Sequence, residues 1–370
     1  MQIGIVTRNL IEEGGGIENY LNPIFMRLSM QDSLHVLTQR FENEKFSVPY
    51  RVEHPAGYSF LAFWLWTLAN RRRLFEESDL IVSGSALTAP LIKGACKPKA
   101  CFVYGLDLMY PNPVYQRWFP PALKHMDSVL ACSAATRELC IQRGVSPAKV
   151  HVAYPGVDSK RFAPDKEAGY KIRQRLQIPD EAPVVFSVSR HVRRKGILRL
   201  VRDIAPALVR DNKNIRIVVG GQGPLTPEIK ETVAKLGLSE NVFLVGYIPD
   251  AELPAYYNMA DVFALPEEPV AGDFEGFGIV HLEASACGVP SVGSHMEAAT
   301  EAIEHGVRGV ACDPYDLGEH VRNIKKFLAD KSYREDFSSR CRERILESWT
   351  IENSASVAAE MVRSVAGHGD

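Results

Sequence analysis

The sequence has few features of an exported, membrane-spanning or repetitive protein. Its 370 residues contain 7 cysteines, scattered without a Cys-x-x-Cys pair, so neither a disulfide framework nor a zinc site is expected. No apolar run reaches the roughly 18 residues that a membrane-spanning helix needs, and no internal repeat stands out. The first residues enter a strand pattern at once and lack the basic start and long apolar core of a signal peptide. These absences predict a cytoplasmic protein.

The sequence also lacks the dinucleotide fingerprint of a dehydrogenase. The glycine-rich run Gly220 to Gly223 does not have the spacing G-x-G-x-x-G, and no acidic residue lies about 20 residues further on as a strand-end ribose ligand. Its composition is that of an ordinary globular protein, with 46% hydrophobic and 24% charged residues. At 370 residues the chain exceeds what one hydrophobic core usually organises, so two domains are expected.

Short apolar runs alternate with helical stretches, which predicts parallel sheets built from βαβ units. The expected strands of a first sheet are residues 3–7, 35–38, 80–83, 100–104, 128–131 and 149–153. Those of a second sheet are residues 184–188, 215–220, 242–245, 262–265, 290–293 and 309–312. Residues 154–164, rich in turn formers, are the expected linker. The predicted fold class is α/β, with two Rossmann-like halves.

The segment from Glu275 to Glu283 gives the clearest indication of ligand chemistry. Its two carboxylates are separated by a glycine-containing loop that continues as the first turns of a helix. Backbone N–H groups at a helix start bind anions such as phosphate, whereas carboxylates accept hydrogen bonds from hydroxyl groups. The combination predicts a sugar-nucleotide ligand. A helix-surface carboxylate is the structural alternative for Glu283.

A basic loop follows the expected strand at 184–188. It holds four cations between Arg190 and Lys195, at the carboxyl end of a buried parallel strand. Ligands of open α/β sheets bind at that edge, and an Arg fork and a Lys point charge both suit a diphosphate. The alternative is that the cations at 193–195 form a solvated helix start.

At this point the motifs resemble those of a known family, the retaining glycosyltransferases of the GT-B fold (family 4-like, group 1). This family includes sucrose synthase and many bacterial mannosyl- and glucosyltransferases. The resemblance extends over nearly the whole chain and rests on five motifs in the expected order: Gly14–Glu18, Pro155–Asp158 with Phe162, Ser189-Arg190 with Lys195-Gly196, Ala260–Pro266 and Glu275–Glu283. It implies an acceptor-binding domain at 1–160, a nucleotide-sugar donor-binding domain at 161–351, and a last helix at 352–370 that returns to the first domain. The two domains would face each other across a cleft.

The resemblance also implies roles for individual residues. Arg190 and Lys195 would hold the donor diphosphate and stabilise charge on the leaving group, which is electrostatic catalysis without a metal. Backbone N–H groups of three residues would add to this effect: Phe277, Gly278 and Ile279. Glu275 would orient the transferred sugar and Glu283 would bind the ribose hydroxyls.

Further contacts are expected from glycine turns and a strand end. Gly15 and Gly16, in a loop after the first strand, would contact pyrophosphate and acceptor, with a flexible turn as the alternative. Gly221 and Tyr247 follow expected strands of the second domain and would line the nucleotide pocket through main-chain groups.

One departure from the family pattern concerns the acceptor side. Many members carry a histidine after the fourth strand of the first domain, where this chain has Tyr104. A tyrosine hydroxyl, with a reference pKa of about 10, is a poor proton acceptor at neutral pH. Asp107 is therefore the better candidate for binding the acceptor or positioning its hydroxyl as a catalytic residue, and a strand-end aspartate capping the next turn is an equally good alternative.

The resemblance implies a retaining, metal-independent hexosyltransferase that serves cell-surface polysaccharide or glycolipid synthesis. No Asp-x-Asp sequence is present to bridge a divalent ion to a diphosphate, so no required metal is expected. The donor is expected to be a nucleoside-diphosphate sugar, with GDP-mannose favoured, and the acceptor a glycan or lipid-linked glycan. No cofactor and no nucleic-acid partner are expected. The alternative function is a sugar-nucleotide-binding protein, or an epimerase of similar architecture, without transfer activity.

A membrane contact is a further hypothesis. Residues 60–75 combine aromatic bulk with three arginines, as membrane-surface helices do. The protein would then work at the inner face of the cell membrane. The alternative is a buried helix of the first domain that emerges at Arg71.

Overall fold

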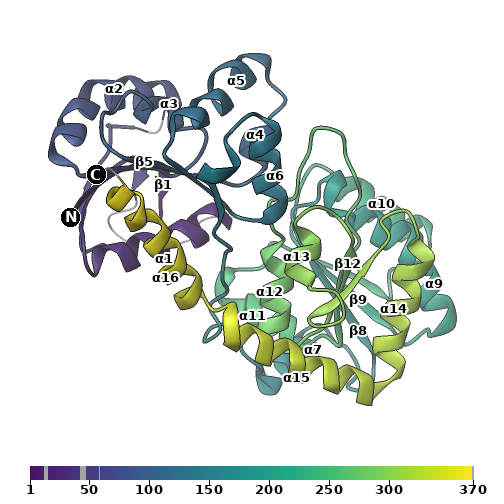
Figure 1. Cartoon of the computed structure of the whole chain (residues 1–370). Helices are drawn as coiled ribbons and strands as arrows, with labels where there is room; N and C mark the ends of the chain where they lie inside the picture. The colour runs from purple at the N-terminus through teal and green to yellow at the C-terminus, as the bar shows by residue number, and fades with distance from the viewer. Residues whose placement is uncertain (12–15, 42–46, 58, 369–370) are drawn as a thin grey trace. The chain divides into compact units, whose positions relative to one another are not determined.

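The computed structural model describes residues 1–11, 16–41, 47–57 and 59–368 of the chain. These residues form two compact α/β units (Figure 1). The first unit comprises Met1–Gly156 and Ile351–Asp370, and the second comprises Val157–Thr350. The sequence places the corresponding boundaries after residues 160 and 351.

The first unit is built on a parallel sheet in the order β3-β2-β1-β4-β5-β6-β7. Its strands are β1 (Gln2–Leu10), β2 (Ser33–Phe41), β3 (Arg51–Glu53), β4 (Leu80–Ser83), β5 (Lys99–Val103), β6 (Ser128–Ala131) and β7 (Val150–Val152). Every strand expected for this sheet is present. The edge strand β3 was missed because its three residues are mostly polar; it pairs with β2 in the register His35 to Arg51.

Both faces of this sheet are buried, because successive side chains of a strand point to opposite faces. Ile3 and Ile5 of β1 belong to one apolar core, whereas Val6 belongs to another.

The helices of the first unit are α1 (Gly16–Ser29), α2 (Phe60–Glu77), α3 (Ala89–Ile92), α4 (Leu106–Met109), α5 (Pro113–Trp118), α6 (Ala134–Gln142), α16 (Ile351–Ser364) and the short 3-10 turns η1 (Pro120–His125), η2 (Pro147–Lys149) and η6 (Ala366–His368).

The C-terminal helix α16 lies against α1 in the first unit (Figure 1). Its small side chains, including Ala355 and Ala358, join Tyr20 and Phe25 of α1 in one core. Arg363 of α16 also forms an ion pair with Asp32, at 2.7 Å between Nε and Oδ2. The last helix is therefore integral to the first unit.

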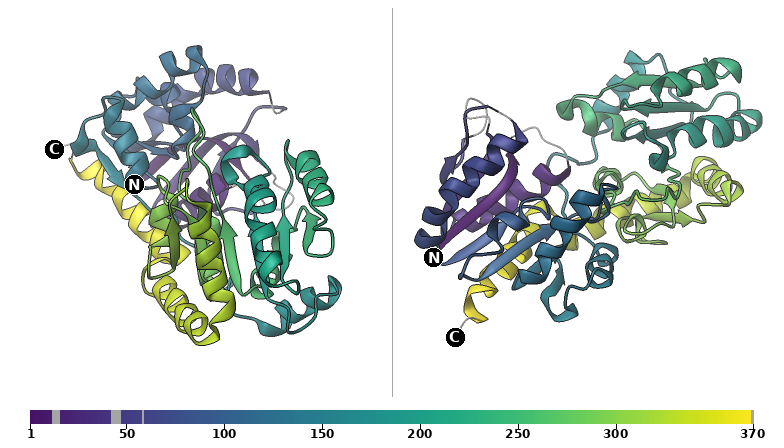
Figure 2. Two further views of the ribbon diagram at one scale, coloured as in Figure 1. Left: turned by 90° about the vertical axis from the view of Figure 1, so that its right-hand side faces the viewer. Right: turned by 90° about the horizontal axis from the view of Figure 1, so that it is seen from above.

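The second unit has a parallel sheet in the order β10-β9-β8-β11-β12-β13, with helices on both of its faces (Figure 2). Its strands are β8 (Val184–Val188), β9 (Arg216–Gly220), β10 (Val242–Gly246), β11 (Val262–Leu265), β12 (Ser291–Ser294) and β13 (Gly309–Cys312), all expected from the sequence. Its helices are α7 (Lys166–Arg175), η3 (Arg193–Lys195), α8 (Ile197–Arg199), the π-helical η4 (Leu200–Ile204), α9 (Ala205–Asp211), α10 (Thr226–Lys235), η5 (Asp250–Glu252), α11 (Leu253–Asn258), α12 (Ile279–Ala286), α13 (Ala299–Ile303), α14 (Leu317–Ala329) and α15 (Lys331–Ser348).

Each sheet has one point at which the strand order reverses. In the first unit this switch point lies between β1 and β4, and in the second between β8 and β11. Doubly wound sheets bind ligands outside the carboxyl ends of the strands at such points. No helix among the described residues combines the length and apolar character needed to cross a membrane.

Candidate active site

The switch point of the second unit brings together the two charged segments that the sequence singles out. The loop after β8 carries Arg190 and Lys195, and the loop after β11 leads through Glu275 to α12. Gly196 fixes their approach: its φ is +67°, and a Cβ atom on it would lie 1.8 Å from the carbonyl oxygen of Pro266. Only glycine allows this contact, which sets Lys195 beside the end of β11.

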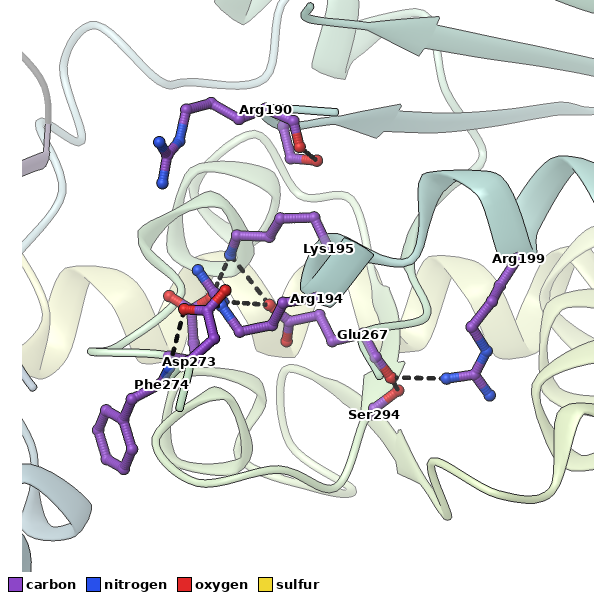
Figure 3. Close-up of polar contacts among 10 residues, drawn as sticks. Arg190, Arg194, Lys195, Arg199, Glu267, Asp273, Phe274 and Ser294 are labelled. Carbon is purple, nitrogen blue, oxygen red and sulfur yellow. Dashed lines mark hydrogen bonds and ion pairs between the residues drawn. The ribbon is translucent and has the colours of Figure 1, made fainter. Parts of the chain in front are cut away.

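Five side chains meet there, and we call them the charge cluster: Arg194, Lys195, Glu267, Asp273 and Glu275 (Figure 3). The Lys195 Nζ atom lies 2.9 Å from Glu267 Oε1 and also donates to Glu275. Arg194 bonds to Glu275, and its Nε atom lies 3.0 Å from Asp273 Oδ1. Glu275 therefore accepts from two cations at once.

The cluster is largely removed from solvent, and its protonation follows from that. Burial raises the pKa of Glu275, but the charges of Lys195 and Arg194 outweigh this effect and hold the pKa well below its usual range. Burial also raises the pKa of Glu267, and the nearby Glu275 raises it further against the opposing effect of Lys195. Glu275 is thus the ionised carboxylate of the pair, and Glu267 is the one that holds a proton.

Arg190 stands apart from these ion pairs. Its side chain is exposed and has no ion-pair partner among the residues that the structure describes. Figure 3 shows the side chains of Arg190 and Lys195 extending in the same direction, whereas Arg199 lies on the other side of Lys195 and Glu267, beside Ser294. Arg199 and Ser294 both donate to the carbonyl oxygen of Glu267, at 3.0 and 2.6 Å, and so fix its backbone.

The glycine-containing loop ends at the start of α12, as the sequence predicts. Gly278 is the N-cap residue with a φ of +83°, and Ile279 is the first helical residue. Phe277 is buried and stacks on Trp349, with 5.7 Å between the ring centroids. The first-turn amides of α12 thus present the positive end of a helix dipole.

Glu283 lies one turn into α12 and is partly buried. Its Oε2 atom accepts a 2.7 Å hydrogen bond from the hydroxyl of Tyr257. Burial raises its pKa to about 7, against the opposing effect of that bond. Glu283 is thus a half-buried carboxylate on the helix and not a fully exposed one.

Two other residues expected at the donor site follow neighbouring strands. Gly221 has a φ of +101°, and a Cβ atom on it would lie 1.9 Å from the carbonyl oxygen of Ser189. Its N–H donates to the carbonyl oxygen of Gly246 at 2.7 Å, so the structure uses this amide internally. Tyr247, directly after β10, is 68% exposed.

The switch point of the first unit opens into a cavity of about 680 Å³. Its lining residues come from the ends of β1, β4 and β5 and from α1, α2, α4 and α5: Thr7, Arg8, Asn9, Ile17, Glu18, Phe60, Gly84, Ser85, Leu87, Tyr104, Leu106, Asp107, Tyr110, Asn112, Val114, Tyr115 and Phe119. Most of these side chains are apolar or aromatic. The two expected acceptor residues, Tyr104 and Asp107, are both in this wall.

The polar groups of Tyr104 and Asp107 have partners in the protein. The Tyr104 hydroxyl donates to the carbonyl oxygen of Gly84 at 2.9 Å. The two Asp107 oxygens accept from the amides of Tyr104 and Ala86, at 2.9 and 3.0 Å, which is the capping role that the sequence left open. Burial raises the Asp107 pKa to about 6, although these backbone bonds oppose the shift. Gly16 begins α1, and Gly15 lies outside the described residues.

Sequence reasoning missed three members of the charge cluster. Arg194 was counted among the four cations of the basic loop without a role of its own, and the alternative of a solvated helix start does not describe it, since it is 5% exposed; Glu267 is fully buried. Glu267 and Asp273 follow β11, so the rule that ligands gather at strand ends could have indicated them. Tyr257, which donates to Glu283, could not be found by this rule, because it lies on helix α11 and does not follow a strand.

The fold and this site define a class: two Rossmann-like parallel-sheet units with the last helix returned to the first, which is the GT-B architecture of glycosyltransferases. Residues 170–344 match the model of glycosyl transferases group 1, and residues 14–161 match that of glycosyltransferase family 4. The chain belongs to this family of glycosyltransferases.

Relatives along the full length agree with this assignment. The chain is 32% identical to a GDP-mannose-dependent alpha-(1-6)-phosphatidylinositol monomannoside mannosyltransferase of Mycolicibacterium smegmatis, over 97% of both chains. It is 28% identical to the Mycobacterium tuberculosis protein of the same name, again over 97% of both. Among solved structures, the Anabaena protein HepE in complex with UDP and glucose has a TM-score of 0.79 at 20% identity, covering 97% of this chain and 99% of that one. Sucrose-phosphate synthase from Thermosynechococcus elongatus has a TM-score of 0.80 at 20% identity, covering 99% of each chain.

Proposed function

We propose that this glycosyltransferase is a retaining, metal-independent mannosyltransferase that moves mannose from GDP-mannose to a lipid-linked acceptor. The observation that carries the proposal is the charge cluster with Arg190 at the switch point of the second unit. Three cations gather there, Arg190, Arg194 and Lys195, and the proton that Glu267 keeps reduces the negative charge beside them, which favours binding of a diphosphate.

The donor would lie along the carboxyl edge of the second sheet. Arg190 and Lys195 bind the diphosphate, and the first turn of α12 adds amide dipoles from Phe277 to Ile279. Glu283, already held by Tyr257, accepts hydrogen bonds from the ribose hydroxyls. Glu275, ionised and fixed by two cations, accepts from hydroxyls of the sugar and orients it.

Transfer with retention needs the leaving group to depart and the acceptor to enter on the same face of the sugar. In the proposed step, the bond from the anomeric carbon to the phosphate oxygen breaks, and a bond from that carbon to the acceptor oxygen forms. The acceptor's proton passes to the departing phosphate oxygen. Arg190 and Lys195 stabilise the charge that accumulates on that phosphate. Because side-chain cations supply this stabilisation, we expect turnover to survive EDTA treatment.

The mannose donor and the lipid acceptor rest on the full-length relatives. The names of these relatives specify GDP-mannose and a phosphatidylinositol monomannoside, and the Mycolicibacterium smegmatis protein is 32% identical over 97% of both chains. The 680 Å³ cavity of the first unit suits an acceptor with a polar headgroup and apolar surroundings, since it mixes Asn112 and Asp107 with aromatic side chains.

A donor panel tests this proposal. GDP-mannose, GDP-glucose, UDP-glucose and UDP-N-acetylglucosamine are compared by thermal shift, then by donor hydrolysis, and then by transfer to phosphatidylinositol mannoside acceptors. We expect GDP-mannose to give the largest shift, to be hydrolysed slowly without acceptor, and to be consumed quickly by transfer when the acceptor is present. Binding with neither hydrolysis nor transfer would support the sugar-nucleotide-binding alternative instead.

A further inference from the structure

A second hollow in the first unit has a different chemistry from the acceptor cavity. It has a volume of about 370 Å³ and is lined by Lys93, Arg117, Trp118, Pro121, Ala122 and His125. We call it the basic cleft. Its residues come from the end of α3, from α5 and from η1. The last two segments follow one another along the chain, and the fold brings α3 into contact with η1.

The basic cleft carries positive charge that the protein does not neutralise. Among the residues that the structure describes, no carboxylate lines the cleft, and Lys93, Arg117 and His125 take part in no ion pair. The arginines of α2 differ in this respect. Arg72 pairs with Glu76, and Arg73 bonds to Glu53 at 2.7 Å. The cations of the cleft are therefore available to an external anion, whereas Arg72 and Arg73 of the segment that the sequence pointed to are paired with carboxylates.

Large apolar side chains are exposed next to the cleft. Trp118, in its wall, is 59% exposed, and Val114, one turn earlier on α5, is 67% exposed. On α2, Leu61 and Leu65 lie one turn apart on the same face and are 68% and 60% exposed. Figure 1 shows α2, α3 and α5 along the same edge of the first unit.

A packing contact joins these two apolar patches. Trp64 of α2 lies against Phe119, the residue after Trp118, with 5.5 Å between the ring centroids. The exposed face of α2 is therefore continuous with the surroundings of the cleft. Exposed apolar groups beside unpaired cations mark an interaction surface rather than an ordinary solvated one.

We propose that the basic cleft and the exposed side chains around it bind an anionic phospholipid bilayer. The cleft takes a lipid phosphate, Trp118 lies at the headgroup level, and Leu61, Leu65 and Val114 enter the acyl boundary. A nucleic acid fits less well, because such surfaces neutralise on the order of 6–10 phosphates and the cleft offers three cationic or basic side chains. The hydrocarbon of a bilayer would also bury Leu61 and Leu65, whereas a bound polyanion would leave these two side chains exposed to water.

This inference rests on the proposed function and deepens it, because a membrane surface is where a lipid-linked acceptor would be found. Val114 lines the acceptor cavity and is also part of the exposed apolar surface. A lipid-linked acceptor could thus place its headgroup in the cavity while its chains stay in the bilayer. The place of action would be the surface of an anionic leaflet.

Vesicle flotation of the whole protein tests the proposal without any donor. Phosphatidylcholine vesicles are compared with vesicles in which about a third of the lipid is phosphatidylglycerol. We expect flotation with the anionic vesicles only, weakening as salt is raised. The double variant Lys93→Glu with Arg117→Glu should lower the partition coefficient at least about tenfold, since each surface cation contributes on the order of 1 kcal/mol to such binding. Trp118→Ser should lower it about threefold.

Matched changes in the second unit serve as controls. Lys230→Glu alters an exposed cation of α10, and Tyr315→Ser removes a tyrosine that is 80% exposed. Both should float like the unaltered protein. The proposal is overturned if the unaltered protein fails to float, or if the charge-reversed variant floats as well as it does. Hydrolysis of GDP-mannose in the absence of vesicles reports separately on the proposed function and should be the same for all these variants.

Discussion

The two units use the same topological position for different chemistry. In both sheets the strand order reverses once, and in both the ends of the strands at that point line a site. In the first unit these ends open into a largely apolar cavity, whose Tyr104 and Asp107 are engaged with backbone groups. In the second unit they hold a buried cluster of cations and carboxylates.

The difference shows what the shared architecture determines and what it leaves to the loops. The sheet fixes where a ligand binds, whereas the residues following each strand fix which ligand it is. Under the proposed function, the cations of the second unit suit the diphosphate of the donor, and the largely apolar walls of the first unit suit an acceptor with apolar parts.

The largest effect is expected from removing a cation of the second unit. Lys195→Ala should lower kcat about 100- to 1000-fold, because the departing diphosphate loses a charge-assisted contact that strengthens as its bond breaks. The neighbouring Arg193, with a side chain 77% exposed, provides the control, and Arg193→Ala should stay within about twofold. Steady-state kinetics with GDP-mannose measures both. Equal losses in the two variants would remove the special role of Lys195.

A smaller effect is expected at Glu283, and it depends on pH. Because burial raises its pKa to about 7 and ribose hydroxyls bind the ionised form, nucleotide affinity should weaken as the pH falls through 7. Glu283→Gln should lower affinity for GDP about tenfold at pH 8 and abolish this dependence. Calorimetric titration with GDP between pH 6 and 8 measures the affinity at each pH. Glu343→Gln, at an exposed residue of α15, serves as the control. A pH-independent affinity in the unaltered protein would contradict the assignment.

A change in the cavity of the first unit should alter the kinetics with the acceptor and leave donor hydrolysis unchanged. Asp107→Asn leaves only one side-chain oxygen for the amides of Tyr104 and Ala86, which should cost about 1 kcal/mol in the free energy of unfolding. Acceptor KM should rise severalfold, while donor hydrolysis stays unchanged. Thermal unfolding and two-substrate kinetics check these outcomes. A matching loss of donor hydrolysis would show that the two units do not divide the work in this way.

The smallest effect concerns the protonated carboxyl of the cluster. Glu267 has a raised pKa, so the folded protein keeps a proton that the unfolded chain releases as the pH rises from acid to neutral. The stability linked to that proton is present at low pH and is lost towards higher pH. Glu267→Gln mimics the protonated form, so its stability relative to the unaltered protein should increase with pH, by about 0.5–1 kcal/mol. Urea unfolding at pH 5, 6, 7 and 8 measures this, and parallel pH profiles would contradict it.

The fold was predictable from the sequence to a greater degree than the site. Strands such as β8 and β11 are short, mostly apolar runs that contain Val and Phe, and their spacing along the chain indicates a buried parallel sheet. The placement of Lys195 and Glu275 at one edge followed from the rule for strand ends. The burial of Arg194 and Glu267 could not follow, because it depends on the contact between Gly196 and Pro266, which only the folded chain brings together.

The surface of the first unit gives a second lesson. The run of three arginines in α2 suggested a basic membrane helix. In the structure Arg73 is paired with the distant Glu53, Arg72 with Glu76 one turn along the same helix, and Arg71 donates to the carbonyl oxygen of Leu91. The unpaired cations of the basic cleft come from the end of α3 and from the consecutive segments α5 and η1, which the fold brings together. The charge available to a ligand depends on which cations are already in ion pairs. The sequence shows pairs between neighbouring residues of a helix, but it does not show pairs between residues far apart in the chain.

The most direct test of the account is a crystal structure of the whole protein with GDP. The account predicts the diphosphate at the carboxyl ends of β8 and β11, with its oxygens about 3 Å from Lys195 Nζ and from the Arg190 guanidinium. The ribose hydroxyls should then meet the Glu283 carboxylate. A nucleotide bound elsewhere, or Lys195 still bonded only to Glu267 and Glu275 and far from any phosphate, would contradict it.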